Sequence, residues 1–157
     1  MRRRATLSDV KIHLISIANR ARSDGFDSLA KVYIDRLAPY VKTEATVLRS
    51  EALFFEWAER TRERTPPVLL LLDSRGRQFS SEQFAEWLGK QRDSGKQSLV
   101  IAIGPADGWS GQARDRADTL LSLSSMTMPH EMVRLVVAEQ LYRAFTILAG
   151  HPYHSGH

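Results

Sequence analysis

The chain contains no cysteine among its 157 residues. This absence excludes disulfide bonds, thiolate metal sites and cysteine nucleophiles, and it fits a cytoplasmic protein. No apolar run approaches the roughly 20 residues of a membrane-spanning helix, so we expect no membrane partner. The basic start, Met1-Arg2-Arg3-Arg4, has no apolar segment behind it. We therefore expect no signal peptide there.

Several ligand-binding motifs are also missing. The segment Gly104-Pro105-Ala106-Asp107-Gly108 lacks the G-x-G-x-x-G spacing, and there is no G-K-[ST] phosphate loop. NAD and ATP are therefore disfavoured as ligands. The three histidines at 151, 154 and 157 have no acidic or thiolate ligand close by in the sequence, so we expect no metal site.

The composition is that of a globular protein with a modest basic excess. Hydrophobic residues make up 43% and charged residues 25%, and 22 Lys and Arg against 18 Asp and Glu give a net charge of +4. This Arg-weighted excess is compatible with a nucleic-acid partner but is weak evidence by itself. The length predicts one domain. We expect a flexible N-terminal extension over residues 1–10 and a single domain over residues 11–157.

Apolar runs alternate with helical patterns along the whole chain. The segment 41–48 has a period of two, which predicts a strand with one exposed face, whereas 68–72 and 99–103 are apolar throughout and predict strands buried on both faces. The alternation predicts an α/β fold with a largely parallel sheet covered on both faces. The expected strands are 11–18, 41–48, 68–72, 99–103 and 120–123. The expected helices are 28–37, 51–64, 80–92, a short one within 109–118, and 129–149, and 19–27 is expected to be a loop.

Three loops follow apolar strands of this predicted sheet. They are the segments 73–76, 104–108 and 122–127. Because ligands of open parallel sheets bind outside the carboxyl ends of the strands, the three loops are expected to converge on one pocket. A plain tight turn between strand and helix remains the alternative explanation for Gly104 and Gly108.

The last expected helix is apolar nearly all round, which means burial in a core or against a second copy of the chain. Arg134 shares a face of this helix with His130, Leu141 and Phe145. A buried Arg needs a partner, which here is a core acid, a subunit interface or a phosphate. Arg143 follows Glu139 by four residues, so an ion pair within the helix is expected for it.

Four pieces of the sequence carry a resemblance to a known family. They are Ile103–Gly108, Leu121–His130, Val133–Arg134 with Ala138–Ala144, and His151–His154. They closely resemble the RlmH family, the 23S rRNA pseudouridine N3-methyltransferases of the SPOUT class. The resemblance implies a parallel sheet with a C-terminal trefoil knot, a homodimer, and S-adenosylmethionine as methyl donor. It also implies the ribosome as the source of the RNA substrate.

The resemblance carries site residues onto this chain. The implied cofactor-binding residues are Leu72, Gly104, Leu123, Ser124, Ser125, Met126, Thr127 and Met128. The candidates for substrate positioning or catalysis are His130, Arg134, Tyr153 and His154, and the candidates for RNA contact are Arg143 and His151. For His130, a structural role at the helix start, bonding a backbone group, is the alternative.

One departure from the family pattern is Pro105, which stands where the family has a second glycine. Proline removes one backbone N–H, so it either weakens cofactor binding or only stiffens the turn; we favour the stiffened turn. Two other functions stay open at this point. One is a SPOUT methyltransferase with another RNA target, and the other is a non-catalytic ribosome-binding factor that kept the fold.

Overall fold

The computed structural model describes residues 9–18 and 25–155. Within them, five parallel strands form one sheet in the order β2-β1-β4-β3-β5. The strands are β1 (Lys11–Ile17), β2 (Lys42–Leu48), β3 (Val68–Arg77), β4 (Ser98–Ile103) and β5 (Thr119–Leu121). The helices are α1 (Gly25–Arg36), α2 (Glu51–Arg60), α3 (Ser81–Asp93), α4 (Gly111–Arg116), α5 (His130–Leu148) and the 3-10 helix η1 (Pro152–His154). The predicted α/β class and parallel sheet are confirmed.

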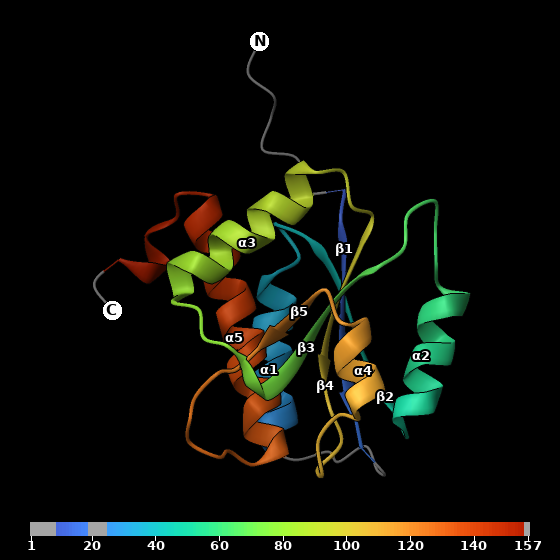
Figure 1. The fold of residues 1–157 in the computed structure, drawn as a ribbon. Coiled ribbons are helices and arrows are strands. Elements are labelled where there is room, and N and C mark those ends of the chain that lie inside the picture. Colours follow the sequence, from blue (N-terminus) through green and yellow to red (C-terminus); the bar gives the residue numbers. More distant parts are fainter. Residues whose placement is uncertain (1–8, 19–24, 156–157) are drawn as a thin grey trace.

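The sheet is the middle of three layers. Helices α1, α3 and α5 cover one face, and α2 and α4 cover the other (Figure 1). Each face has its own core: Leu141 of α5 packs into the first, and Phe54 of α2 into the second. The expected cover on both faces is therefore present, and it explains why β4 is buried along its whole length.

Helix α5 lies between α1 and α3 and makes most of the contacts within its layer. Its Val137, Leu141 and Phe145 are buried, while Leu135 and Val136 are only partly covered. The helix is thus part of the core, as its apolar composition predicts, but one side of it is incompletely covered within a single chain.

Helix α3 begins with a cap formed by two residues three positions apart in the sequence. Ser80 caps α3 in a reciprocal capping box, in which its side chain accepts from the backbone N–H of Gln83 and the Gln83 side chain accepts from the backbone N–H of Ser80. Among the described helices, none is long and apolar enough to cross a membrane.

Several predicted boundaries are wrong. Helix α1 begins at Gly25, so the end of the expected loop 19–27 is helical; residues 19–24 lie outside the described residues. Helix α2 ends at Arg60 and not at 64, because Thr61 caps it by donating its hydroxyl hydrogen to the Trp57 carbonyl oxygen. Strand β5 ends at Leu121, two residues early, where Ser122 leaves the ladder and its N–H donates to the Arg77 carbonyl oxygen.

Strand β3 is longer than the apolar run that predicts it. Both Leu72 and Arg77 are paired with Leu121, so the segment 73–76 bulges out of the ladder between them. Gly76 makes the return possible, because a Cβ there would lie 2.5 Å from the carbonyl carbon of Leu120. What is expected to be a free loop after β3 is therefore an outward bulge anchored at both ends.

Two expectations concern the edges of the domain. The alternation predicted for the segment 41–48 holds only in its first half: Val41 is buried and Thr43 is half-buried, whereas Val47, on the same predicted face, is 36% exposed. An edge strand with only one neighbour lacks the cover that central strands have. Of the expected extension 1–10, residues 1–8 lie outside the described residues, and Val10 is 4% exposed and packs in the core.

Candidate functional site

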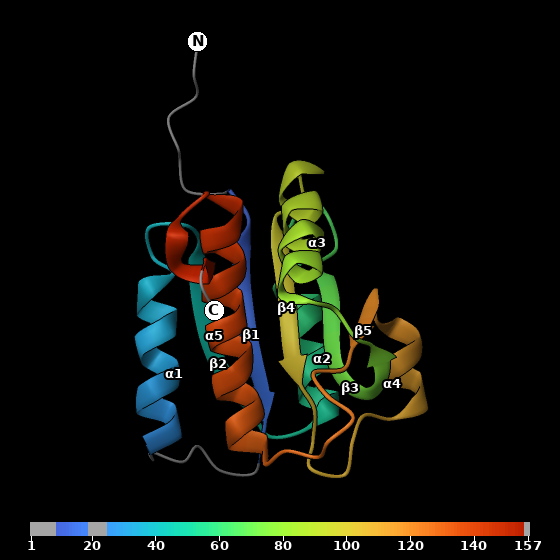
Figure 2. The same ribbon diagram turned by 90° about the vertical axis from the view of Figure 1, so that its left-hand side faces the viewer.

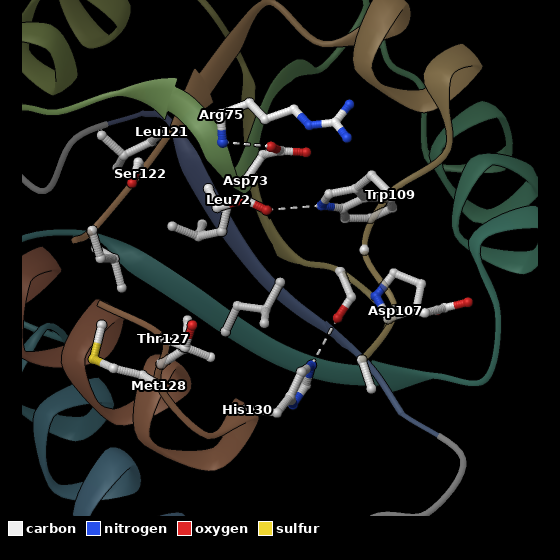
Figure 3. A pocket seen from close by; sticks show the side chains of 18 of the residues that line it. Leu72, Asp73, Arg75, Asp107, Trp109, Leu121, Ser122, Thr127, Met128 and His130 are labelled. Atoms are coloured by element: carbon white, nitrogen blue, oxygen red, sulfur yellow. Dashed lines mark hydrogen bonds between the residues drawn. The ribbon is translucent and has the colours of Figure 1, made fainter. Parts of the chain in front are cut away.

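A cavity of about 700 Å³ opens at the carboxyl ends of β3, β4 and β5. The loops after these strands meet in it, as predicted from the parallel sheet (Figure 3). We call it the strand-end cavity. All eight residues expected to bind a cofactor line it: Leu72, Gly104, Leu123, Ser124, Ser125, Met126, Thr127 and Met128.

Trp109 forms a rigid wall of the strand-end cavity. Its indole Nε1–H donates to the carbonyl oxygen of Leu72 at 3.0 Å, and the side chain is buried. Gly104 lets the indole lie close, because a Cβ there would be 2.6 Å from Nε1. Gly108 has a φ of +89°, so the loop after β4 also contains the tight turn that was the alternative explanation for its glycines.

The wall is tied to a distant helix. The backbone N–H of Ser110 donates to Glu51 Oε1 at 2.8 Å, and the Ser110 hydroxyl donates to Glu51 Oε2 at 2.5 Å. Ser110 also caps α4 by accepting from the N–H of Ala113. The segment 109–111 therefore holds one conformation set by α2 and α4, which fixes the position of Trp109.

The Ser-rich loop after β5 forms the opposite wall. The Ser122 hydroxyl donates to the carbonyl oxygen of Ser124 at 3.1 Å, and the Ser124 hydroxyl accepts from the N–H of Met126 at 2.9 Å. Short bonds of this kind hold a loop in shape without regular structure. Met126 is 78% exposed at the outer end of this loop.

His130 lies at the start of α5 and lines the strand-end cavity. Its Nε2 is 2.9 Å from the carbonyl oxygen of Gly104. A carbonyl only accepts, so Nε2 carries the hydrogen and donates, which leaves Nδ1 of the neutral ring with its lone pair. The backbone bond considered as the structural alternative is thus present, at the cavity itself.

Charged side chains of both signs face the strand-end cavity. Asp73 Oδ1 accepts from the backbone N–H of Arg75 at 2.8 Å, and Asp73 Oδ2 lies 3.9 Å from a guanidinium nitrogen of Arg114. Arg114 also donates to the carbonyl oxygen of Trp109 at 2.6 Å. Asp107 lies at the exposed rim. This end of the cavity therefore carries charges of both signs.

An apolar cavity of about 290 Å³ adjoins the first one and shares Leu72, Leu121 and Leu123 with it. Phe79 and Phe84 add aromatic surface to it. Together the two spaces offer an apolar end and a polar, charged end, which is the usual composition of a small-molecule site.

The other predicted catalytic residues do not line the strand-end cavity of this chain. Arg134 forms an ion pair with Asp27 of α1, one of the three partners that were open for it. Tyr153 and His154 lie past the far end of α5. That helix has 19 residues and so is roughly 28 Å long. Figure 2 shows η1 at the upper end of the molecule, whereas the loop after β4 is at the lower end.

The C-terminal turn is held by a network of charged and aromatic side chains. Arg143 donates to Glu139 Oε1 at 2.6 Å, which confirms the expected pair within α5, and also to His154 Nδ1 at 2.9 Å. His154 Nε2 then donates to Glu82 of α3 at 2.7 Å. The Tyr153 hydroxyl donates to Glu139 at 3.1 Å. His151 is the N-cap of η1 and its Nδ1 accepts from the N–H of Tyr153.

This network shifts two pKa values. Burial, followed by the negative charge of Glu139, raises the pKa of Tyr153 to about 12. The hydrogen bond to Glu139 raises the pKa of Arg143 further above its ordinary value. Both side chains therefore keep their protons at neutral pH, and the turn is a set of fixed donors around one carboxylate.

Trp109, Glu51 and Arg114 are site residues that the sequence reasoning missed. Trp109 directly follows the glycine loop, and this position is the one signal that marks it in the sequence. Glu51 lies 59 residues from Ser110, so no local pattern points to their contact. Among the described residues, no group of three or more His, Asp or Glu is placed to hold a metal ion.

Comparison with known proteins gives sequence relatives over nearly the whole chain. A family model described as "Predicted SPOUT methyltransferase" matches residues 10–154. A protein of Koribacter versatilis named "Ribosomal RNA large subunit methyltransferase H" is 44% identical over 94% of this chain and 100% of that protein. A protein of the same name from Rhizobium leguminosarum bv. trifolii is 45% identical over 92% of this chain and 99% of its own length.

Solved structures share the fold at much lower identity. The SpoU methyltransferase AviRb from Streptomyces viridochromogenes, crystallised in complex with the cofactor AdoMet, aligns with a TM-score of 0.52 at 16% identity, over 92% of this chain and 60% of that one. A probable methylase family protein from Haemophilus influenzae aligns with a TM-score of 0.55 at 13% identity, over 96% of this chain and 72% of that one. At these identities the likeness concerns the arrangement of strands and helices alone.

Proposed function

Because this chain belongs to the SPOUT methyltransferase family, together with the proteins named ribosomal RNA large subunit methyltransferase H, we propose that it methylates N3 of a pseudouridine in 23S rRNA with S-adenosylmethionine as donor. The observation that carries the proposal is the strand-end cavity, in which three loops from separate parts of the sequence meet. The RNA is the partner, and we infer that the protein works in the cytoplasm, where the large subunit is.

The residues of the two cavities fit S-adenosylmethionine. A nucleoside with an amino-acid chain needs an apolar slot and a polar end, and a total space within the usual 300–1,000 Å³ of small-molecule sites. Leu72, Leu121 and Leu123 supply the apolar surface, and the Ser loop supplies backbone groups. When bound, S-adenosylmethionine supplies an electrophilic methyl group.

Proton removal is the step that the chain itself must assist, since N3 of a uracil-type ring carries a hydrogen. His130 is the side chain placed for this step, because its Nε2 is held by the Gly104 carbonyl and, in the neutral form of the ring, Nδ1 has a lone pair. The same hydrogen bond fixes the orientation of the ring. Holding the two reactants in the cavity then provides proximity.

Two substitutions of His130 separate proton handling from positioning. In His130→Gln the side-chain amide nitrogen can still donate to the Gly104 carbonyl, but no basic nitrogen remains. We expect both His130→Ala and His130→Gln to lose about 100- to 10,000-fold in methylation rate with ribosomes, while binding of S-adenosylmethionine persists. Undiminished methylation by His130→Ala contradicts any role for the residue, and near-normal activity of His130→Gln alone assigns it to positioning.

The substrate is tested by mass spectrometry of large-subunit rRNA. RNA from a strain without the gene should lack one methyl group on a pseudouridine, and the purified chain with S-adenosylmethionine should restore it on ribosomes from that strain. Restoration on another RNA, such as tRNA, would instead support the SPOUT methyltransferase with a different target.

We further propose that the chain works as a homodimer. Leu135 and Val136 of α5 are incompletely covered, which suits a second copy packed on this helix. A second copy also offers a way to bring Tyr153 and His154 to a strand-end cavity, because the cavity of their own chain is too far away. Arg143 and His151 would then face the RNA near that cavity. Equilibrium sedimentation should give twice the mass of the chain, and a monomer at assay concentration would contradict this.

The C-terminal trefoil knot belongs to the same proposal. The chain leaves β5 beside β3, forms one wall of the strand-end cavity over residues 122–128 and then enters α5. Such a path forms a knot if the end of the chain passes through a loop of the backbone. Refolding from urea that is much slower than for unknotted domains of this size supports it.

Calorimetry distinguishes the proposed methyltransferase from the rival function, a ribosome-binding factor without catalysis. The Pro105 carbonyl accepts from the N–H of Gly108 at 2.8 Å, so Pro105 is the first residue of the tight turn. The strand-end cavity stays open beside it. We therefore expect heat on titration with S-adenosylmethionine, and its absence at high protein concentration would favour the binding factor.

A further inference from the structure

We propose that Asp73 and Arg114 form the subsite for the amino-acid end of the methyl donor. Asp73 would accept from the α-ammonium group, and Arg114 would donate to the α-carboxylate. The inference rests on the proposed function, because it assigns one part of the donor to two residues of the strand-end cavity.

Asp73 is a carboxylate with unused acceptor capacity in a sheltered place. Its side chain is 7% exposed, yet it lines the strand-end cavity. One oxygen accepts from the backbone N–H of Arg75, which fixes the carboxylate. Within the described residues, the charged group that the other oxygen approaches is Arg114, at 3.9 Å, which is beyond hydrogen-bond range. A sheltered carboxylate of this kind gains from a cationic donor.

Arg114 is a fixed cation with donors to spare. It donates to the Trp109 carbonyl at 2.6 Å, which holds the guanidinium at the cavity wall. A guanidinium has five N–H donors in a planar fork, and one such bond leaves most of them available. Its side chain is 25% exposed and faces the same space as Asp73. Planar forks of this kind match carboxylates.

The pairing of the two charges selects the ligand class. The ammonium and carboxylate groups of an amino acid are attached to one carbon, so a receptor for them needs neighbouring charges of opposite sign. Asp73 and Arg114 have this arrangement. A phosphate of the RNA backbone would be repelled by Asp73, and a simple cation would be repelled by Arg114. A zwitterion satisfies both residues at once.

The apolar part of the site lies beside this pair. Leu72 directly precedes Asp73 and lines both cavities. An adenosine group in the apolar space can therefore extend its amino-acid chain toward the bulge 73–76. A bound ligand would then contact the bulge and the α4 helix together.

Three probes that differ only at this end test the assignment by calorimetry. S-adenosylhomocysteine carries both charged groups, its decarboxylated form keeps the amine, and 5′-methylthioadenosine has neither. Asp73→Asn should weaken the first two probes about tenfold to a hundredfold and leave the third unchanged. Arg114→Gln should weaken S-adenosylhomocysteine alone by a similar factor.

Matched controls carry the same charge changes at the rim of the strand-end cavity. Arg75→Gln and Asp107→Asn alter exposed side chains, and neither should change the ratio of affinities for the three probes. Binding of 5′-methylthioadenosine shows for each variant that the cavity is still formed, including the Trp109 wall that Arg114 supports.

The outcomes separate this inference from the proposed function. If Asp73→Asn and Arg114→Gln weaken all three probes alike, or none, the pair has only a structural role and the inference is overturned, while the methyltransferase assignment stands. If the wild-type chain binds none of the probes, the proposed function fails and the inference with it. An effect confined to the charged probes, in the pattern given above, supports the subsite.

Discussion

Replacing Gly104 with alanine tests the packing that builds the cavity wall. The backbone of Gly104 is outside the left-handed region, so alanine brings no backbone strain. Its methyl group, however, would lie 2.6 Å from Nε1, 2.8 Å from Cε2 and 2.9 Å from Cδ1 of Trp109. These distances are shorter than carbon and nitrogen atoms tolerate, and the indole must move.

The cost follows from two effects. Overpacking of a well-packed core costs about 1–3 kcal/mol. Displacing the indole also breaks its 3.0 Å hydrogen bond to the Leu72 carbonyl, and a buried carbonyl left without a donor costs about 1–3 kcal/mol. We expect Gly104→Ala to lower the free energy of unfolding by about 2–6 kcal/mol in total. For a domain of this size, that corresponds to a fall in Tm of roughly 5–25 °C.

Urea unfolding followed by far-ultraviolet circular dichroism measures this loss. A second substitution, Trp109→Ala, removes the three indole atoms that meet the new methyl group. Alone it should also destabilise the protein, but combined with Gly104→Ala it should cost clearly less than the sum of the two single changes.

Gly111→Ala is the matched control in the same cavity wall. A Cβ there meets only a guanidinium nitrogen of Arg114 at 3.9 Å, and the residue is helical and exposed. It should be neutral or stabilising by up to about 1 kcal/mol. If Gly104→Ala is as harmless as this control, or if its effect simply adds to that of Trp109→Ala, the steric explanation is refuted.

Two further predictions concern titrating groups. Burial lowers the pKa of His13 below its ordinary value of 6.5, so the unfolded chain binds the proton more readily and the free energy of unfolding falls as the pH drops through that region. His13→Phe keeps a ring against Trp57, and it should reduce the fall of the urea midpoint with decreasing pH. A fall of equal steepness in the variant would show that other groups cause it. The pKa of Tyr153, raised from 10.0 to about 12, predicts a tyrosine that ionises only near pH 12 in an absorbance titration, and Glu139→Gln should lower that pKa because it removes the neighbouring negative charge. A titration that is complete well below pH 12 would contradict the burial of this phenol.

Much of the candidate site was predictable because it depends on local pattern and on one rule of sheet geometry. The runs 68–72 and 99–103 are too apolar and too short for anything but buried strands. Parallel strands end at the same edge, so the loops that follow them are expected together, and they do line one cavity. The bulge 73–76 was predicted as a plain loop, because nothing in its sequence reveals the return of the chain to Leu121.

The amino-acid sequence by itself determined the classes of element, their order, the Ser80 cap and the Glu139–Arg143 pair, all of which depend on residues a few positions apart. Only the tertiary structure decided which distant groups meet. Trp109 reaches the Leu72 carbonyl because β3 and β4 are neighbours in the sheet, and Tyr153 lies away from the cavity because α5 runs along the strands. Such contacts depend on how all the elements pack at once, and this information is spread over the whole chain.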